Sequence, residues 1–167
     1  MTLKIKRSAA EAKSRLVHIS LLSLNLRLME NWRAVQIAMA GKVLDYESTM
    51  IIMAIIVISA ERLLRSELEL DLQTLEKRLP EAQMSRVNLS SIAAATAINR
   101  ETVRRKVNEL QTSGLVVRSK EGIRMAHGLI TYDVLREVIT SQLEAITQTA
   151  NQLARLGVLV TQLPSDG

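Results

Sequence analysis

The segment from Ser90 to Leu110 constrains the fold more than any other part of the chain. Small or apolar side chains recur where a first helix and a tight turn would pack against a second helix. These positions are Ile92, Ala93, Ala97, Ile98, Val103, Val107 and Leu110. The spacing is typical of two short helices that cross closely. We therefore expect a helix-turn-helix here.

The second of these helices has clear end signals. Asn99 is a good N-cap, because its side-chain oxygen can accept a hydrogen bond from an early backbone N–H. Gly114 supplies the left-handed residue that often ends a helix. Two short runs then follow, joined by Ser119–Gly122, where Gly122 can take a positive φ. This pattern predicts a β-hairpin wing, with Arg86–Asn88 as a short third strand.

Polar and charged side chains occupy the outer face of the predicted second helix. Glu101, Arg105 and Asn108 share this face at 100° per residue, and Arg100 and Arg104 lie on one flank. Such a stripe suits the major groove of DNA, where side chains reach the base edges. These five residues are our base-edge candidates.

The run INRETVRRKVNELQTSGLV resembles the DNA-binding domain of the catabolite activator protein (Crp/Fnr) superfamily. In that family a cap residue followed by R-E-T-V-x-R opens the recognition helix. The resemblance covers residues 86–125. It implies base-edge roles for Arg100, Glu101 and Arg105, and a phosphate role for Thr102.

The family's effector-binding β-roll is not expected in this chain. Such a roll needs many strands and tight glycine turns, but only Gly41 precedes Gly114 among the glycines, and no proline precedes Pro80. Cyclic-nucleotide binding is therefore not implied, and the sequence has no signature of a small-molecule effector.

The chemistry of these side chains fits a division between base and phosphate contacts. Arg105 or Arg100 can bridge guanine O6 and N7, and Glu101 can accept from cytosine N4. Arg104 suits either role. Further phosphate contacts are expected near the first helix and on the wing, from Ser90, Ser91, Arg118 and Lys120.

The charge distribution favours the same segment. The chain has a net charge of +5; residues 86–124 carry 8 basic and 3 acidic side chains, residues 1–85 carry 12 and 10, and residues 125–167 carry 2 and 4. A local basic surplus is expected of a protein that binds a polyanion. Aromatic residues make up only 2% of the chain, which disfavours stacking platforms for single strands or RNA.

Other functional classes find little support. Cysteine is absent, and His18 and His127 stand alone, so we expect no metal site, no cofactor and no enzyme. The longest apolar run, Met50–Ala60, is 11 residues, whereas a membrane span needs about 20. The N-terminal segment lacks the apolar core of a signal peptide, so we expect a cytoplasmic protein that does not enter the membrane.

Residues 8–40 lack Gly and Pro and are expected to be helical, with a break near Glu30–Asn31 as an equal alternative. Two apolar stripes run along this segment, which suggests burial on two sides, most readily against a second subunit. One stripe contains Val17, Leu21, Leu24, Leu28, Val35 and Met39, and the other contains Leu16, Ile19, Leu26 and Met29.

Three further segments complete the helical pattern. A cap at Asp45–Thr49 precedes a buried helix at Met50–Arg65, and Ser66–Lys77 is expected to be partly helical before the break at Pro80. Tyr132–Leu156 should form the last helix, capped by Gly157. Its seam packs either on its own domain or on a partner helix, and contains Leu135, Ile139, Gln142, Ile146, Thr149, Leu153 and Leu156.

The sequence thus predicts a mainly α protein, with a winged helix-turn-helix flanked by long N- and C-terminal helices. We expect a helical dimerisation or support region at 1–80, the DNA-binding domain at 81–128, a C-terminal helix at 129–157 and a flexible tail at 158–167.

The predicted function is sequence-specific binding of double-stranded DNA by a homodimeric, bacterial-type transcription regulator, because one recognition helix contacts little DNA. Two alternatives remain open. One is a winged-helix module for protein–protein interaction. The other is an architectural or phage-type DNA-binding protein without a regulatory role.

Overall fold

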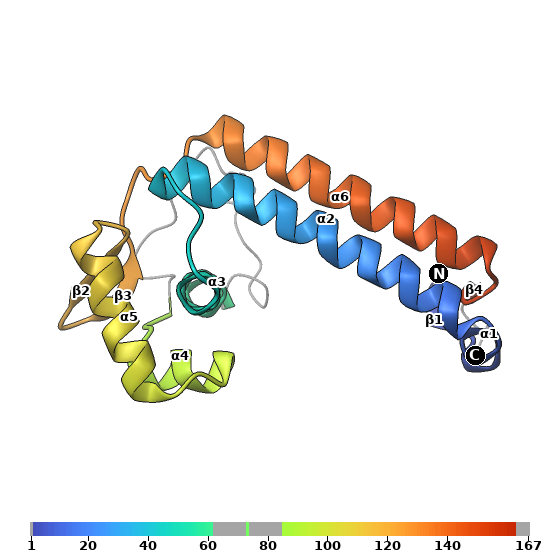
Figure 1. Cartoon of the computed structure of the whole chain (residues 1–167), viewed down its shortest axis with the longest axis horizontal. Helices are drawn as coiled ribbons and strands as arrows, with labels where there is room; N and C mark the ends of the chain where they lie inside the picture. The colour runs from blue at the N-terminus through green and yellow to red at the C-terminus, as the bar shows by residue number, and fades with distance from the viewer. Residues whose placement is uncertain (1, 62–72, 74–84, 163–167) are drawn as a thin grey trace. The chain divides into compact units, whose positions relative to one another are not determined.

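The structure is a computed structural model that describes residues 2–61, 73 and 85–162. Within these ranges the chain is mainly helical, as expected, and contains two small antiparallel sheets of two strands each (Figure 1). It divides into two compact units. The first contains the residues up to Val35 and those from Asp133 onward, and the second is Gln36–Tyr132. No described helix has the length and apolar character to cross a bilayer.

In the first unit, two long antiparallel helices lie side by side, and a small sheet joins segments distant in sequence (Figure 1). In β1 and β4, Thr2 pairs with Gln162 and Ile5 pairs with Leu159. The Lys6 N–H extends this ladder by donating to the Val158 carbonyl at 2.8 Å. The elements are β1 Thr2–Ile5, α1 Arg7–Ala12, α2 Ser14–Ala40, α6 Tyr132–Arg155 and β4 Leu159–Gln162.

Small and polar residues are buried along α2 and α6, and polar contacts join the two helices. Ser20, Ala145 and Thr149 are almost fully buried. The Ser141 hydroxyl donates to the Asn31 side-chain oxygen at 3.0 Å, and the Arg27 guanidinium donates to the side-chain oxygen of Gln148. One side of α2 thus packs against α6.

The expected N-terminal helix is interrupted, but not where the alternative placed the break. The helical backbone stops at Lys13, between α1 and α2, while α2 runs without interruption through Glu30–Asn31. The contact from Ser141 to Asn31 supports the helix at that point. Of the two apolar stripes, the first is buried at Val35 and Met39, whereas every member of the second is exposed.

The second unit is built on α3 Tyr46–Ala60, which contacts two helices and a strand of the unit. The other elements are α4 Leu89–Thr96, α5 Arg100–Thr112, β2 Val116–Ser119 and β3 Gly122–Met125. Their shared core contains Ile51, Ile52, Ile55, Val87, Ile92, Val103, Val107, Leu110, Leu115, Val116 and Ile123. The expected burial of the first- and second-helix residues is therefore confirmed at Ile92, Val103, Val107 and Leu110.

Helix α3 begins earlier than expected and is buried on one side only. Asp45 is its N-cap and accepts from the Ser48 N–H at 3.0 Å, so the helix starts at Tyr46 and not at Met50. Its exposed side carries Met53, Ile56 and Val57, although the sequence predicted a buried helix. The expected end of this helix at Arg65, the expected partial helix at 66–77 and the break at Pro80 lie outside the described residues, apart from Gln73.

Helix α6 matches the expected last helix, and Gly157 follows it with φ of 71°. The buried side of α6 is rotated about the helix axis relative to the predicted seam. Thr149 and Leu153 are buried, but Ile139 and Ile146 are exposed, because the buried side passes through the small residue Ala145.

The division of the structure differs from the expected segment boundaries at 80, 128 and 157. Helix α3 belongs with α4 and α5, and α6 belongs with most of α2. Beyond α6, Val158 is buried and Leu159–Gln162 is a strand, where a flexible tail was expected. Residues 163–167 of that tail lie outside the described residues.

Candidate nucleic-acid interface

The start of α4 is held by a reciprocal cap. The Asn88 side-chain oxygen accepts from the backbone N–H groups of Ser90 at 3.0 Å and Ser91 at 2.9 Å. The Ser91 hydroxyl accepts from the Asn88 N–H at 3.0 Å and donates to the Asn88 carbonyl at 2.8 Å. Such a capping box satisfies donors that a helix start leaves unpaired. Of the two serines proposed for phosphate contact, Ser91 thus has its hydroxyl engaged in the cap, whereas Ser90 is exposed.

The turn between α4 and α5 is tight, and it contains a strained residue. Ala97 has φ of 56° and ψ of 16°, and among the described residues it is the only non-glycine with a positive φ. A small side chain limits the cost of this left-handed conformation. Asn99 then caps α5 as predicted, with its side-chain oxygen accepting from the Glu101 N–H at 2.8 Å. The turn and the cap together fix where the outer face of α5 begins.

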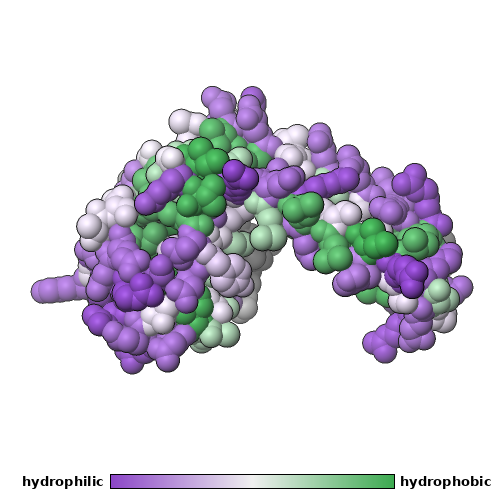
Figure 2. Space-filling model, viewed as in Figure 1, coloured by the Kyte–Doolittle hydropathy of each residue, from purple (hydrophilic) through white to green (hydrophobic). Residues whose placement is uncertain are grey.

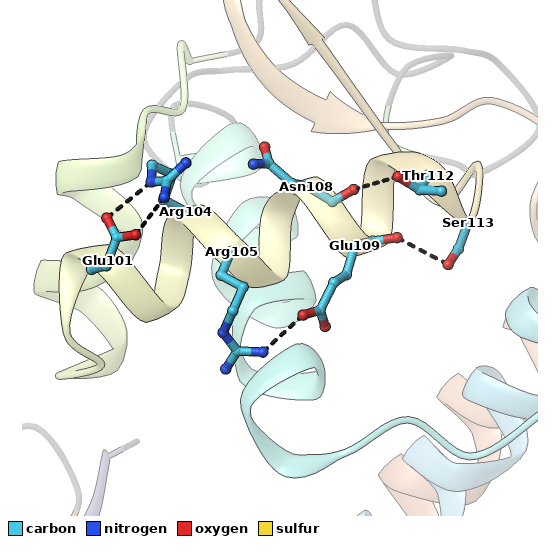
Figure 3. Close-up of a pocket in the computed structure, with 7 residues that line it drawn as sticks. All are labelled: Glu101, Arg104, Arg105, Asn108, Glu109, Thr112 and Ser113. Atoms are coloured by element: carbon cyan, nitrogen blue, oxygen red, sulfur yellow. Dashed lines mark hydrogen bonds and ion pairs between the residues drawn. The ribbon is translucent and has the colours of Figure 1, made fainter.

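The outer face of α5 lines a shallow pocket of about 530 Å³ (Figure 3). Its lining residues are all polar or charged and include four of the five base-edge candidates. The lining residues are Glu101, Arg104, Arg105, Asn108, Glu109, Thr112 and Ser113. The fifth candidate, Arg100, is exposed at the first position of α5. Thr102 is half-buried and does not line the pocket.

The first cation of this face is paired within its own helix. The Arg104 guanidinium donates to both Glu101 oxygens, at 2.9 and 2.5 Å, as Figure 3 shows. Hydrogen bonding from Arg104 lowers the pKa of the Glu101 carboxyl, and the same bonds raise the pKa of Arg104. The pair therefore stays doubly charged at neutral pH, with the planes of its two groups held in a fixed orientation.

Arg105 contacts two carboxylates. Its guanidinium donates to Glu109 at 2.8 Å, one turn later in α5, and lies 3.7 Å from Glu47 in α3. The sequence predicted that Arg105 lies on an outward stripe and indicated neither of these acids as its partner. The structure places both of these acids beside it.

The neighbouring Lys106 links α5 to the cap of α3. Its ammonium donates to Asp45 at 3.0 Å and lies 3.4 Å from Glu109. Burial opposes ionisation of Asp45, but hydrogen bonds from the Ser48 N–H, the Lys106 ammonium and the Ser48 hydroxyl outweigh it and lower the pKa to about 2. Hydrogen bonding to Asp45 likewise raises the pKa of Lys106, against the effect of burial. Lys106 thus acts as a bridge between two helices.

The hairpin after α5 follows the predicted pattern. β2 and β3 pair antiparallel, and Gly122 at the turn has φ of 135°. A Cβ at Gly122 would lie 2.8 Å from the Val87 carbonyl oxygen. The predicted third strand is reduced to a single bridge, in which the Ile123 N–H donates to Val87 at 2.9 Å. The chain before α4 is thereby joined to the hairpin.

A second shallow pocket, of about 320 Å³, lies between this bridge and the hairpin turn. It brings Arg118 and Lys120, both proposed for phosphate contact, together with Arg86, and Glu121 is the one acid in its lining. Within the described ranges, no ion pair joins these three cations or Arg100 to a carboxylate. The unpaired cations therefore lie beside the hairpin and at the start of α5, and the paired cations lie on the outer face of α5.

The sequence analysis did not single out Arg86 or the three acids Asp45, Glu47 and Glu109. Arg86 had a usable signal, because the expected third strand would place it beside the wing. Asp45 and Glu47 had none, since they precede α5 by more than 50 residues. In the described part of the chain, no group of three His, Asp or Glu side chains is close enough to hold a metal ion. The chain matches no protein-family model, no curated protein and no solved structure.

Proposed function

We propose that the chain binds double-stranded DNA in a sequence-specific manner and acts as a homodimeric transcription regulator. In this proposal, α4 and α5 form a helix-turn-helix, β2 and β3 form its wing, and α5 enters the major groove. The compact packing of α3, α4, α5 and the hairpin supports this arrangement. The resemblance of residues 86–125 to the Crp/Fnr DNA-binding domain agrees with it.

One observation carries the proposal. Helix α5 buries Val103, Val107 and Leu110 on one side and presents only polar side chains on the other, and unpaired cations lie at its start and on the following hairpin. Polar groups over the helix face can read base edges, while cations at its margins neutralise the two phosphate strands that flank a groove. This arrangement of polar groups and unpaired cations supports the proposal of DNA binding.

The ion pairs on the face are compatible with reading bases. The side chains of Arg105 and Glu109 are 55% and 50% exposed, and ion pairs between exposed groups are worth about 0–1 kcal/mol. Arg105 can therefore leave Glu109 and bind a guanine edge with little loss of free energy. Glu101, held in place by Arg104, can accept from cytosine N4 without first being ordered.

We assign the phosphate contacts to residues outside the pocket-lining face of α5. Arg118 and Lys120 on the hairpin, joined by Arg86, would hold one strand. Ser90, at the exposed start of α4, would hold the other, and Arg100, exposed at the start of α5, stays a base-edge candidate. Thr102 would contribute from its half-buried position.

The test is a binding titration on random DNA fragments at several salt concentrations. We expect affinity to fall steeply as salt rises. Arg105→Ala should relax sequence preference by about 1–3 kcal/mol at one position, whereas Lys120→Ala should weaken all sequences alike and reduce the salt slope by about 1. Arg136→Ala, an exposed cation on α6, is the matched control and should change neither. Salt-independent affinity would contradict the proposal, and uniform affinity for all sequences would favour an architectural role.

The acids around α5 support a second candidate function, a module for protein–protein interaction. Glu47, Glu101 and Glu109 make the face mixed in charge, which also suits a charged protein partner. The variant Glu109→Gln separates the candidates, because it releases Arg105 and removes a negative charge. DNA binding predicts a gain in affinity on all fragments. An unchanged DNA affinity would favour the interaction module.

A further inference from the structure

We propose that a second copy of the chain packs antiparallel against the outer side of α2. This surface, the α2 outer stripe, consists of Leu16, Ile19, Leu22, Leu26 and Met29. The inference deepens the proposed function and rests on the homodimer within it. The interface involves only residues of the first unit.

The α2 outer stripe is apolar, continuous and uncovered by the described residues. Its five side chains are between 50% and 66% exposed. At 3.6 residues per turn they lie opposite the side that carries buried Ser20 and half-buried Leu24 and Leu28, which is the side facing α6. Figure 2 shows hydrophobic residues along α2 in this unit. An α-helix with apolar residues on two opposite sides requires a partner on each.

The size of the stripe fits a two-fold interface. Five large aliphatic side chains, each about half exposed, present roughly 500 Å² on one copy and about 1,000 Å² on two, the lower limit for a specific interface. A patch of this extent is within the range of roughly 300–600 Å² that the largest apolar patch of a monomer covers, and such patches often bind a partner. A two-fold axis uses the same patch twice, so no second surface is needed.

Charges at the two ends of the α2 outer stripe favour an antiparallel orientation of the two α2 helices. Arg15 lies on the same side of α2 just before the stripe, and Glu30 lies just after it. Neither residue has an ion-pair partner among the described residues. Parallel copies would place each charge against itself. Antiparallel copies can place Arg15 of each against Glu30 of the other.

The same register matches the apolar side chains. When Arg15 lies opposite Glu30 of the second copy, Leu16 lies opposite Met29 and Ile19 lies opposite Leu26. The two-fold axis then falls between Leu22 and Ser23, so the two copies of Leu22 are neighbours across it. Every large side chain of the stripe therefore has an apolar neighbour, and both ends are closed by an ion pair.

The first experiment measures the mass of the full chain in solution, without DNA, by light scattering over a concentration series. We expect a dimer at micromolar concentration and a rise of about a hundred-fold or more in its dissociation constant for Leu22→Lys, since two ammonium groups then meet at the axis. Leu143→Lys is the matched control, because Leu143 is equally exposed but lies on α6. A wild-type monomer overturns the proposal, as does a dimer lost with Leu143→Lys and kept with Leu22→Lys.

The second experiment tests orientation. Arg15→Glu should weaken the dimer about ten-fold by creating like-charged neighbours, and the double variant Arg15→Glu with Glu30→Arg should restore it. Because the chain has no native cysteine, Leu22→Cys should also give a disulfide-linked dimer on oxidation. A dimer with neither rescue nor cross-link overturns the antiparallel interface. A monomer that still binds DNA with salt dependence overturns this inference alone, and a dimer that fails to bind DNA overturns only the proposed function.

Discussion

At the scale of single residues, the charged groups of α5 are defined by their partners. Arg104 is held by Glu101, Arg105 by Glu109 and Glu47, and Lys106 by Asp45. Lys106 is also the least exposed of these three cations, at 12%. Its bond to Asp45 therefore contributes to the packing of α3 against α5, whereas the more exposed arginines can exchange partners.

The Asp45 carboxyl should make the stability of the protein depend on acidity. Its pKa in the folded protein is about 2, below the ordinary value of 3.8. A lowered pKa stabilises the folded state above the ordinary value, and that stabilisation is lost as pH falls from about 4 towards about 2. Asp45→Asn keeps a capping side chain but cannot ionise. Its free energy of unfolding, measured in urea between pH 6 and pH 2, should change less with pH than that of the wild type.

Lys106→Gln serves as the matched variant for this prediction. It removes one of the groups that lower the Asp45 pKa and leaves the bonds from Ser48 in place. Its pH profile should lie between those of the wild type and Asp45→Asn. Parallel profiles for all three proteins would show that the Asp45–Lys106 contact does not act as described.

At the scale of elements, local chemistry determined what the sequence could predict. The cap at Asn99 and the left-handed Gly114 act within a few residues, so the start and the end of α5 could be anticipated, whereas the cap region at Asp45–Thr49 located the start of α3 only to within four residues. The apolar spacing of Val103, Val107 and Leu110 likewise identified the buried side of α5.

Contacts between segments distant along the chain could not be predicted from the sequence. The pairing of β1 with β4 joins segments at opposite ends of the described chain, and neither has a strong strand pattern. The buried side of α6 follows Ala145 because α2 lies close to it, which no heptad pattern of α6 alone reveals. For the site, the side chains on α5 were predictable, but the acids from α3 that pair with them were not.

The hairpin offers a sharp test of the element that would form a wing. Gly122→Ala forces a Cβ against the Val87 carbonyl in a conformation that favours glycine, and should cost about 2 kcal/mol or more. Gly114→Ala is the control, because Gly114 also has a positive φ but has open space around the new Cβ. This variant should lower the free energy of unfolding by roughly 1 kcal/mol. Urea unfolding gives both values. Hydrogen exchange at the Ile123 N–H should quicken for Gly122→Ala, and unchanged exchange would contradict the bridge to Val87.

At the scale of the whole molecule, the β1–β4 sheet ties the first unit together across nearly the full described chain. Lys4 and Val160 are direct partners in this sheet, at a separation that a disulfide can span. The double variant Lys4→Cys with Val160→Cys should oxidise readily and gain about 3–5 kcal/mol over its reduced form, because it closes a very long loop. The shift in Tm between the two forms measures this gain. Lys4→Cys with Gln162→Cys, diagonal in the sheet, should oxidise poorly, and equal oxidation of both pairs would contradict the register.

The second unit lies in sequence between the two halves of the first. On a ribosome, β1 and α2 are therefore made before the second unit, while α6 and β4 follow it. At roughly 5–20 residues per second, β1 waits on the order of ten seconds for its partner strand. During that interval α2 has neither α6 nor β4 beside it, and both of its apolar sides are available to chaperones. Residues 36–132 can meanwhile complete their own core, so the earliest described strand to be made is among the last to pair.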